Sequence, residues 1–110
     1  MSQPAPNESL EALESVLGND STREIVRLFL HDFPGSFNRV VGASREDQMR
    51  IVHGIKSSSL HMGATGLSAR MASLEQKLGT PGETLAPEDI AAALADFGAI
   101  EPVLRKYSGA

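Results

Sequence analysis

The chain has 110 residues and a formal net charge of −4, from 10 Lys and Arg residues against 14 Asp and Glu residues. This length fits one domain, and the acidic balance offers no basic surface for a phosphate backbone, so we expect no nucleic-acid partner. Because the chain has no cysteine, disulfides, thiolate zinc sites and thiol nucleophiles are excluded. It also lacks a signal-peptide pattern and the roughly 18-residue apolar run that crosses a bilayer, so we expect a cytoplasmic protein without membrane insertion.

The helical pattern begins after a polar segment at the N-terminus. Residues 1–7 are predicted to be a flexible tail, and residues 8–110 are predicted to form one helical domain. A short helix over 8–17 ends at Gly18, a residue that suits a left-handed C-terminal cap. Ser21 and the glutamate three residues later have the spacing of a capping box, which predicts that a second helix begins there.

Three further helices follow in the sequence pattern. Ser44 fits the N-terminal cap of a third helix that ends near Gly63, and Thr65 opens a fourth. Pro87 suits the first turn of a fifth helix, which continues to near Tyr107. Short connections between four long amphipathic helices predict an all-α fold, namely an antiparallel up-down four-helix bundle with a short N-terminal capping helix.

His53 lies on the solvent side of the predicted third helix. At about 100° per residue, it is about 150° from the middle of the apolar face, and Lys56 and Ser57 follow one turn later on the exposed side. A neutral imidazole is a nitrogen nucleophile near pH 7 and accepts phosphoryl groups. A lysine beside it neutralises phosphate oxygens, and a hydroxyl donates to them. The apolar face comprises Ile51, Val52, Ile55, Ser59 and Met62.

Apolar and small residues are predicted to surround His53 on its exposed face. Exposed apolar patches with polar rims are common at transient interfaces, and a small residue beside the histidine leaves room for a partner. The alternative is that the apolar members of this set widen the core. The predicted docking residues are Met49, Arg50, Gly54, Leu60, His61 and Ala64.

The other two histidines do not complete a metal site. His61 is eight residues beyond His53, about 12 Å along a helix, which is too far for both rings to ligate one ion. His31, next to Asp32, is predicted to be an exposed polar residue. We therefore expect no metal site and no intrinsic cofactor, and no glycine-rich nucleotide loop is present.

These residues resemble the motif of the histidine-containing phosphotransfer (HPt) domain family. Residues 53–64, HGIKSSSLHMGA, have its histidine, hydrophobic residue, lysine, small residues and apolar-glycine pair, and Leu74 and Glu75 also match. The segment IVRLFLHDFPGSFNRV, residues 25–40, is similar to the second helix of the family. The resemblance covers about residues 20 to 105.

The resemblance implies a histidine phosphotransfer protein of a two-component phosphorelay. His53 would accept a phosphoryl group from a receiver-domain aspartate, or from a kinase, and pass it to another receiver. Lys56 would neutralise phosphoryl charge, and Ser57 stands where the family most often has glycine, which keeps this position small. Glu75 would orient the imidazole, with a solvated helix glutamate as the alternative.

The implied partners are response-regulator receiver domains, which would supply Mg²⁺, and a sensor histidine kinase. The protein would then be a phosphotransfer intermediate rather than an autonomous enzyme, and we expect a monomer. One alternative is a helical interaction module that binds receiver or kinase domains without phosphorylation. A hydrolase or metal enzyme is a third class, for which the sequence offers no ligand set or catalytic triad.

Overall fold

A computed structural model of the chain describes residues 4–110, and this part contains five α-helices and no strand. This confirms the predicted all-α class. None of the described helices combines the length and apolar character that crossing a membrane requires. The helices are α1 (Glu8–Leu17), α2 (Asn19–Asn38), α3 (Arg45–His61), α4 (Thr65–Leu78) and α5 (Pro87–Ser108).

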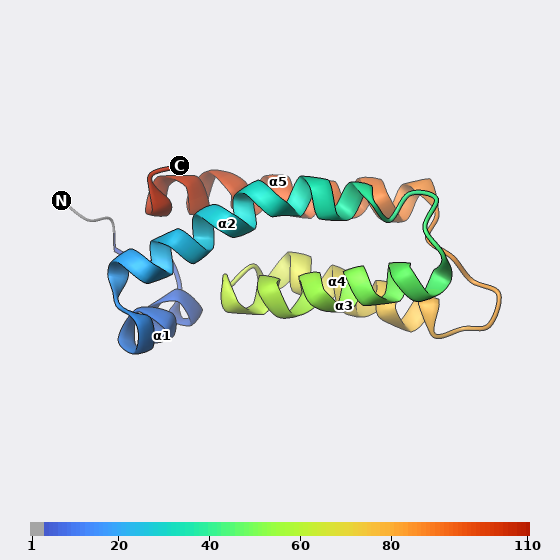
Figure 1. Cartoon of the computed structure of the whole chain (residues 1–110), viewed down its shortest axis with the longest axis horizontal. Helices are drawn as coiled ribbons and strands as arrows, with labels where there is room; N and C mark the ends of the chain where they lie inside the picture. The colour runs from blue at the N-terminus through green and yellow to red at the C-terminus, as the bar shows by residue number, and fades with distance from the viewer. Residues whose placement is uncertain (1–3) are drawn as a thin grey trace.

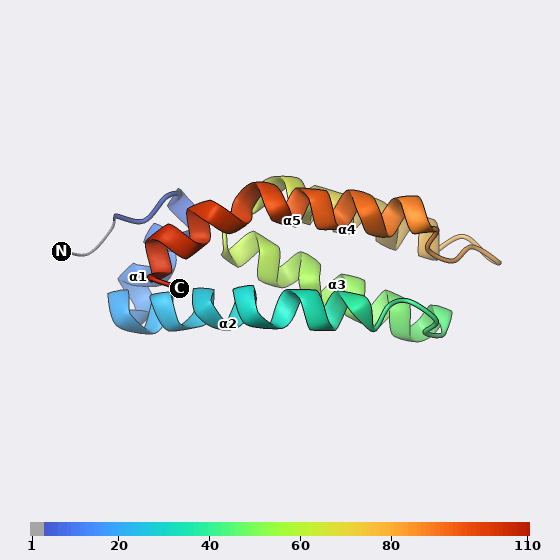
Figure 2. The same ribbon diagram turned by 90° about the horizontal axis from the view of Figure 1, so that it is seen from above.

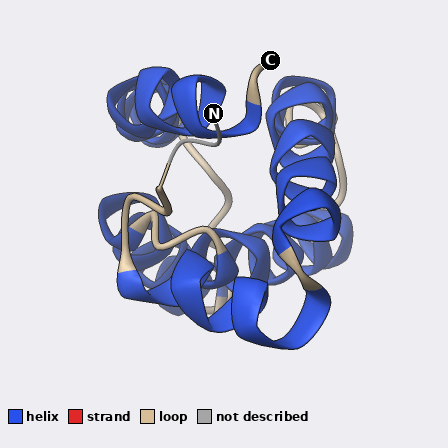
Figure 3. Cartoon of the chain, turned by 90° about the vertical axis from the view of Figure 1, so that its left-hand side faces the viewer, coloured by secondary structure: helices blue, strands red, loops and turns tan. Residues whose placement is uncertain are grey.

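The four longer helices lie along the long axis of a molecule that measures 50 × 21 × 18 Å. Successive helices run in opposite directions, with α2 beside α5 and α3 beside α4 (Figure 1). The view from above shows the same alternation of helix directions along the long axis (Figure 2). The short helix α1 lies at the left-hand end of the molecule in Figure 1, and Figure 3 views the molecule from that end. There α1 contacts α2 and α3. The exposed and buried faces of α3 are therefore fixed by α2 on one side and α4 on the other.

Aromatic rings fill the core where α2 meets α5. Phe29, Phe33 and Phe37 follow one another along α2 at helical spacing, and all three are buried. Phe97 of α5 stacks on Phe33 with the ring centroids 4.2 Å apart. Such stacked pairs add about 0.5–1.5 kcal/mol to the burial of the rings, so the core holds α5 in register with α2.

The helix ends follow the predicted caps except at the start of α2. The Ser44 hydroxyl accepts a hydrogen bond from the backbone nitrogen of Asp47 at 3.2 Å, as expected for the cap of α3. The capping box predicted at Ser21 is wrong, because α2 already begins at Asn19. Gly18, with φ of 84°, is the single residue between α1 and α2 and caps both helices. Ser21 therefore lies inside the first turn of α2.

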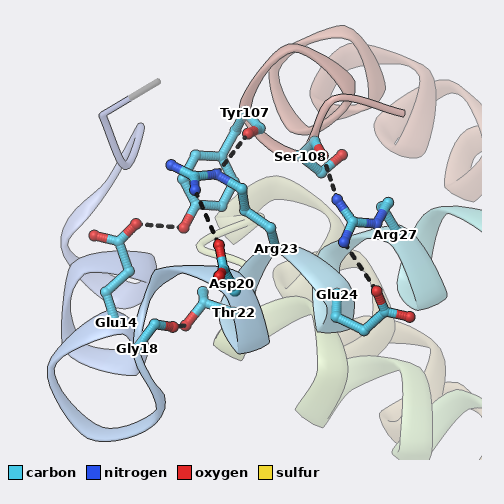
Figure 4. A network of polar contacts seen from close by, with 9 residues as sticks. All are labelled: Glu14, Gly18, Asp20, Thr22, Arg23, Glu24, Arg27, Tyr107 and Ser108. Carbon is cyan, nitrogen blue, oxygen red and sulfur yellow. Dashed lines mark hydrogen bonds and ion pairs between the residues drawn. The ribbon is translucent and has the colours of Figure 1, made fainter. Parts of the chain in front are cut away.

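Polar contacts join the end of α5 to α1 and to α2 (Figure 4). The Tyr107 hydroxyl of α5 donates to the Glu14 carboxylate of α1, and Arg27 of α2 donates to the Ser108 carbonyl at 2.6 Å. The first part of the predicted flexible tail, residues 1–3, lies outside the described residues. Within residues 4–7, Asn7 caps α1 and its amide donates to the Met62 carbonyl at 2.9 Å.

At the opposite end, Gln48 joins two loops that are distant in sequence. Its side chain is buried, with 5% of its surface exposed. The amide nitrogen donates to the Val40 carbonyl at 3.0 Å, and the amide oxygen accepts from the Leu85 backbone nitrogen at 3.3 Å. Gln48 thus links the connection before α3 to the connection before α5.

Candidate functional site

The His53 imidazole lies on the exposed side of α3, with 65% of its side chain accessible. The opposite side of the helix is in the core, where Val52, Ile55 and Met62 are buried and Ile51 is half-buried. This distribution confirms the helical projection, because the apolar residues fix the rotation of α3 and leave His53 facing solvent. A partner therefore has access to the ring.

Glu75 of α4 joins His53 to Lys56. One carboxylate oxygen, Oε2, is 3.5 Å from His53 Nδ1, and the other, Oε1, is 2.8 Å from Lys56 Nζ. Glu75 has 21% of its side chain exposed, so it is not the fully solvated glutamate that was the alternative. The close packing of α3 on α4 brings together groups that are separated in sequence.

These contacts keep Glu75 ionised. The nearby Lys56 ammonium group is the main cause that lowers the pKa of Glu75, and the His53 ring acts in the same direction against the opposing effect of burial. A carboxylate accepts hydrogen bonds and does not donate them. His53 Nδ1 is therefore matched with an acceptor, and a neutral imidazole that donates from Nδ1 carries its free lone pair on Nε2.

Most of the predicted docking residues lie at the surface. Arg50, Gly54, Leu60 and His61 are exposed, as is Ser57 in the candidate site. Leu60 has 54% of its surface accessible, and it lies two helical turns beyond His53 on the exposed side of α3. These positions show that the face is accessible, and its docking role remains a prediction.

Two members of the predicted docking set are placed differently. Ala64 is buried, with 3% of its surface exposed, so its assignment to the docking face is wrong. The projection fails there because α3 ends at His61 and Gly63, with φ of 71°, reverses the chain before α4. Met49 is half-buried and packs against the core, as the alternative proposed.

A groove between α2 and α3 was missed by the sequence analysis. It has a volume of about 620 Å³ and is lined mainly by apolar side chains of both helices, and Arg50, Gly54 and His61 of the predicted docking set are also among the lining residues. Two small residues at i and i+4, Gly54 and Ser58, are the sequence signal for this space. These two residues indicate a groove only when the position of α2 is known, and the sequence pattern of α3 alone does not show that position.

The described residues contain no cluster of three or more His, Asp or Glu side chains that would hold a metal ion. His31 lies 88% exposed on α2 with Asp32 Oδ1 3.1 Å from its Nδ1. No protein-family model matches the chain, and comparison with curated proteins and with solved structures finds no significant match. The interpretation of the site therefore depends on its own chemistry and on the sequence motif.

Proposed function

We propose that this protein is a histidine phosphotransfer protein of a two-component phosphorelay, with His53 as the phosphoryl acceptor. The observation that carries the proposal is the shared Glu75 carboxylate, 3.5 Å from His53 Nδ1 and 2.8 Å from Lys56 Nζ, beneath an exposed imidazole. The similarity of residues 53–64 to the HPt motif supports the same function. We further interpret the four long helices as an antiparallel up-down bundle that α1 caps.

The proposed reaction begins with attack of the His53 Nε2 lone pair on phosphorus. A nitrogen–phosphorus bond forms, and the bond between phosphorus and the aspartate oxygen of a phosphorylated receiver breaks, so that the receiver keeps the electron pair as a carboxylate. The ring becomes cationic as the bond forms, and the Glu75 carboxylate beside Nδ1 stabilises this charge. Return of the group to a second receiver reverses these steps.

In this mechanism Lys56 neutralises charge on the incoming phosphoryl group. Its side chain is 29% exposed, and its ammonium group pairs with the Glu75 carboxylate that also lies next to His53. The charge of a lysine is compact, and its flexible stem lets it reach a phosphoryl oxygen when one arrives. The partner receiver would supply the Mg²⁺ and acidic pocket that neutralise the rest of the charge, so this chain contributes the nucleophile and its immediate electrostatic environment.

The test is phosphoryl transfer from a panel of phosphorylated receiver domains to the native chain, to His53→Gln and to His31→Gln. His31 is the matched control because its side chain is also exposed and it is outside the predicted docking set. We expect acid-labile, base-stable label on the native chain and on His31→Gln, and at least about a 100-fold loss with His53→Gln, since the nucleophile is absent.

Equal labelling of His53→Gln and the native chain would overturn the proposal. Binding of receivers without transfer would favour the alternative function, a helical module that binds receiver or kinase domains independently of phosphorylation. A complex formed equally well by the native chain and His53→Gln, with no label on either, would identify that alternative.

A further inference from the structure

The groove between α2 and α3 has the dimensions of a small-molecule site. Its volume of about 620 Å³ is within the range of about 300–1,000 Å³ that is typical of ligand pockets. Apolar side chains of both helices line it, among them Phe29 and Phe33 from α2 and Ile51 and Ile55 from α3. The groove therefore presents a hydrophobic surface that the protein leaves accessible.

Small side chains on α3 keep this space open. A Cβ atom at Gly54 would meet no heavy atom within 4 Å, so nothing on α2 packs against this position. Ser58, one turn later, donates its hydroxyl to the Gly54 carbonyl at 3.1 Å, so its polar group is already satisfied within α3. Across the groove, Leu28 of α2 remains 52% exposed and forms an apolar wall.

The two ends of the groove differ in charge. Arg39, directly after α2, and Arg50, early in α3, both line it near the connection between these helices. Arg39 donates to the Ser36 hydroxyl at 3.3 Å, and Arg50 is 3.1 Å from the Asp47 carboxylate. Each guanidinium has five N–H donors, so both retain donors for a further acceptor.

The remaining polar groups of the groove limit the ligand charge. Asp32 also lines the groove, which disfavours a second anionic group farther along it. Its carboxylate is 3.1 Å from the His31 ring. Leu13 of α1 and Met62 line the end away from the arginines, next to His61. Arg50 and His61 are eleven residues apart, which is about 16 Å along a helix.

We propose that this groove binds an amphipathic monoanion with one carboxylate and a linear alkyl chain, of the medium-chain fatty-acid class. The carboxylate pairs with Arg39 and Arg50, and the alkyl chain lies along the phenylalanine and isoleucine side chains towards α1. One negative charge and an extended apolar body match the arrangement of two cations at one end. The site is adjacent to His53 but does not depend on the phosphotransfer function.

The first test is calorimetric titration of the native chain with decanoate below its micelle-forming concentration. Gly54→Leu fills the groove, while Gly98→Leu is the matched control, because a Cβ at Gly98 of α5 also meets nothing within 4 Å and Gly98 does not line the groove. We expect one decanoate per chain, at least about tenfold weaker binding to Gly54→Leu, and native affinity for Gly98→Leu.

A second comparison tests the charge selectivity with 1-decanol, which has the same alkyl chain and no carboxylate. The double substitution Arg39→Gln and Arg50→Gln should weaken decanoate by about threefold to tenfold, as expected for exposed ion pairs, and leave 1-decanol unaffected. Arg105→Gln is the control, since Arg105 is an exposed α5 arginine paired with Glu101 and does not line the groove.

Equal decanoate affinity of Gly54→Leu and Gly98→Leu would overturn the proposal, as would equal loss of decanoate and 1-decanol binding in the arginine variant. No heat of binding to the native chain would also overturn it. If the native chain forms a dimer and Gly54→Leu dissociates it, the occupant of the groove is a second copy of the chain, which would also overturn the proposal. The titration uses unphosphorylated protein without a receiver, so its failure is separate from failure of the phosphotransfer proposal.

Discussion

Ser59 illustrates how a single polar atom affects the stability of α3. Its side chain is fully buried, with 0% exposed, and its hydroxyl has no hydrogen-bond partner among the described residues. An unsatisfied buried polar group costs about 1–3 kcal/mol. The helical projection correctly placed Ser59 on the buried face, and only the packed structure shows that no acceptor faces it.

We predict that Ser59→Ala raises the free energy of unfolding by about 1 kcal/mol, because alanine removes the unpaired hydroxyl and changes the shape very little. Urea unfolding measures this change. Ser58→Ala is the control, since Ser58 is exposed and donates to the Gly54 carbonyl, and its effect should remain within about 0.5 kcal/mol. A Ser59→Ala chain less stable than the native protein would contradict the prediction.

Also at the residue scale, Glu75 shows where sequence information was sufficient and where it was not. The exposure of His53 followed from the apolar spacing of α3 alone. The ion pair between Glu75 and Lys56, at 2.8 Å, depends on the register between α3 and α4. The family motif indicated this glutamate, whereas helical periodicity offered no means to select it among the other glutamates of the chain.

At the scale of elements, α3 contains a glycine in its interior for which no packing contact accounts. Gly54 is helical and exposed, and a side chain there would meet no neighbour within 4 Å. Glycine in a helix interior costs about 0.5–1 kcal/mol relative to alanine. The position therefore lowers the stability of α3 and keeps the surface next to His53 open.

Gly54→Ala is expected to raise the free energy of unfolding by about 0.5–1 kcal/mol, measured by thermal or urea unfolding. Gly98→Ala on α5 provides the comparison, because its surroundings are equally open, and a similar gain is expected there. If Gly54→Ala destabilised the chain while Gly98→Ala stabilised it, the open space beside Gly54 would be refuted.

Helix boundaries were predicted correctly where a capping residue acts on its own neighbours in the sequence. Ser44 caps α3 as expected, because its hydroxyl needs only a nitrogen three residues later. Ser21 does not cap α2, since the conformation of Gly18 had already started the helix. Ala64 faces the core because the chain turns at Gly63, and a projection along one helix cannot follow such a turn.

At the scale of the whole molecule, Tyr107 connects the last helix to the first. It is the only tyrosine of the chain, it is buried, and its hydroxyl donates to Glu14. Burial, followed by the hydrogen bond to the Glu14 carboxylate, raises the pKa of Tyr107 to about 12 from an ordinary value of 10.0. The neutral phenol is therefore favoured in the folded protein, and its stabilising contribution is complete below pH 10.

This linkage predicts loss of stability as the pH rises from 10 towards 12. Tyrosinate absorbance reports Tyr107 alone, and we expect a midpoint near pH 12 in the folded chain and near pH 10 in denaturant. Glu14→Gln should lower the folded midpoint, because it removes the neighbouring negative charge. A folded midpoint at pH 10 would contradict the buried contact between α1 and α5.

The features that join distant parts of the molecule were those least accessible from sequence. Gln48 connects two loops through its buried amide, although a glutamine in a polar stretch gives no local indication of such a role. The groove likewise requires both α2 and α3 in place. The positions of the helices were predictable from capping residues and apolar spacing, whereas these contacts depend on how the helices pack.

The most direct test of the central claim is to identify the atom that carries phosphate after the chain reacts with a phosphorylated receiver. Phosphorus NMR and peptide mapping should place one phosphoryl group on His53 Nε2, the nitrogen opposite the Glu75 contact, and the label should then pass to a second receiver. Acid-stable phosphate on Ser57, or a receiver that binds the chain and transfers no phosphate to it, would contradict the account.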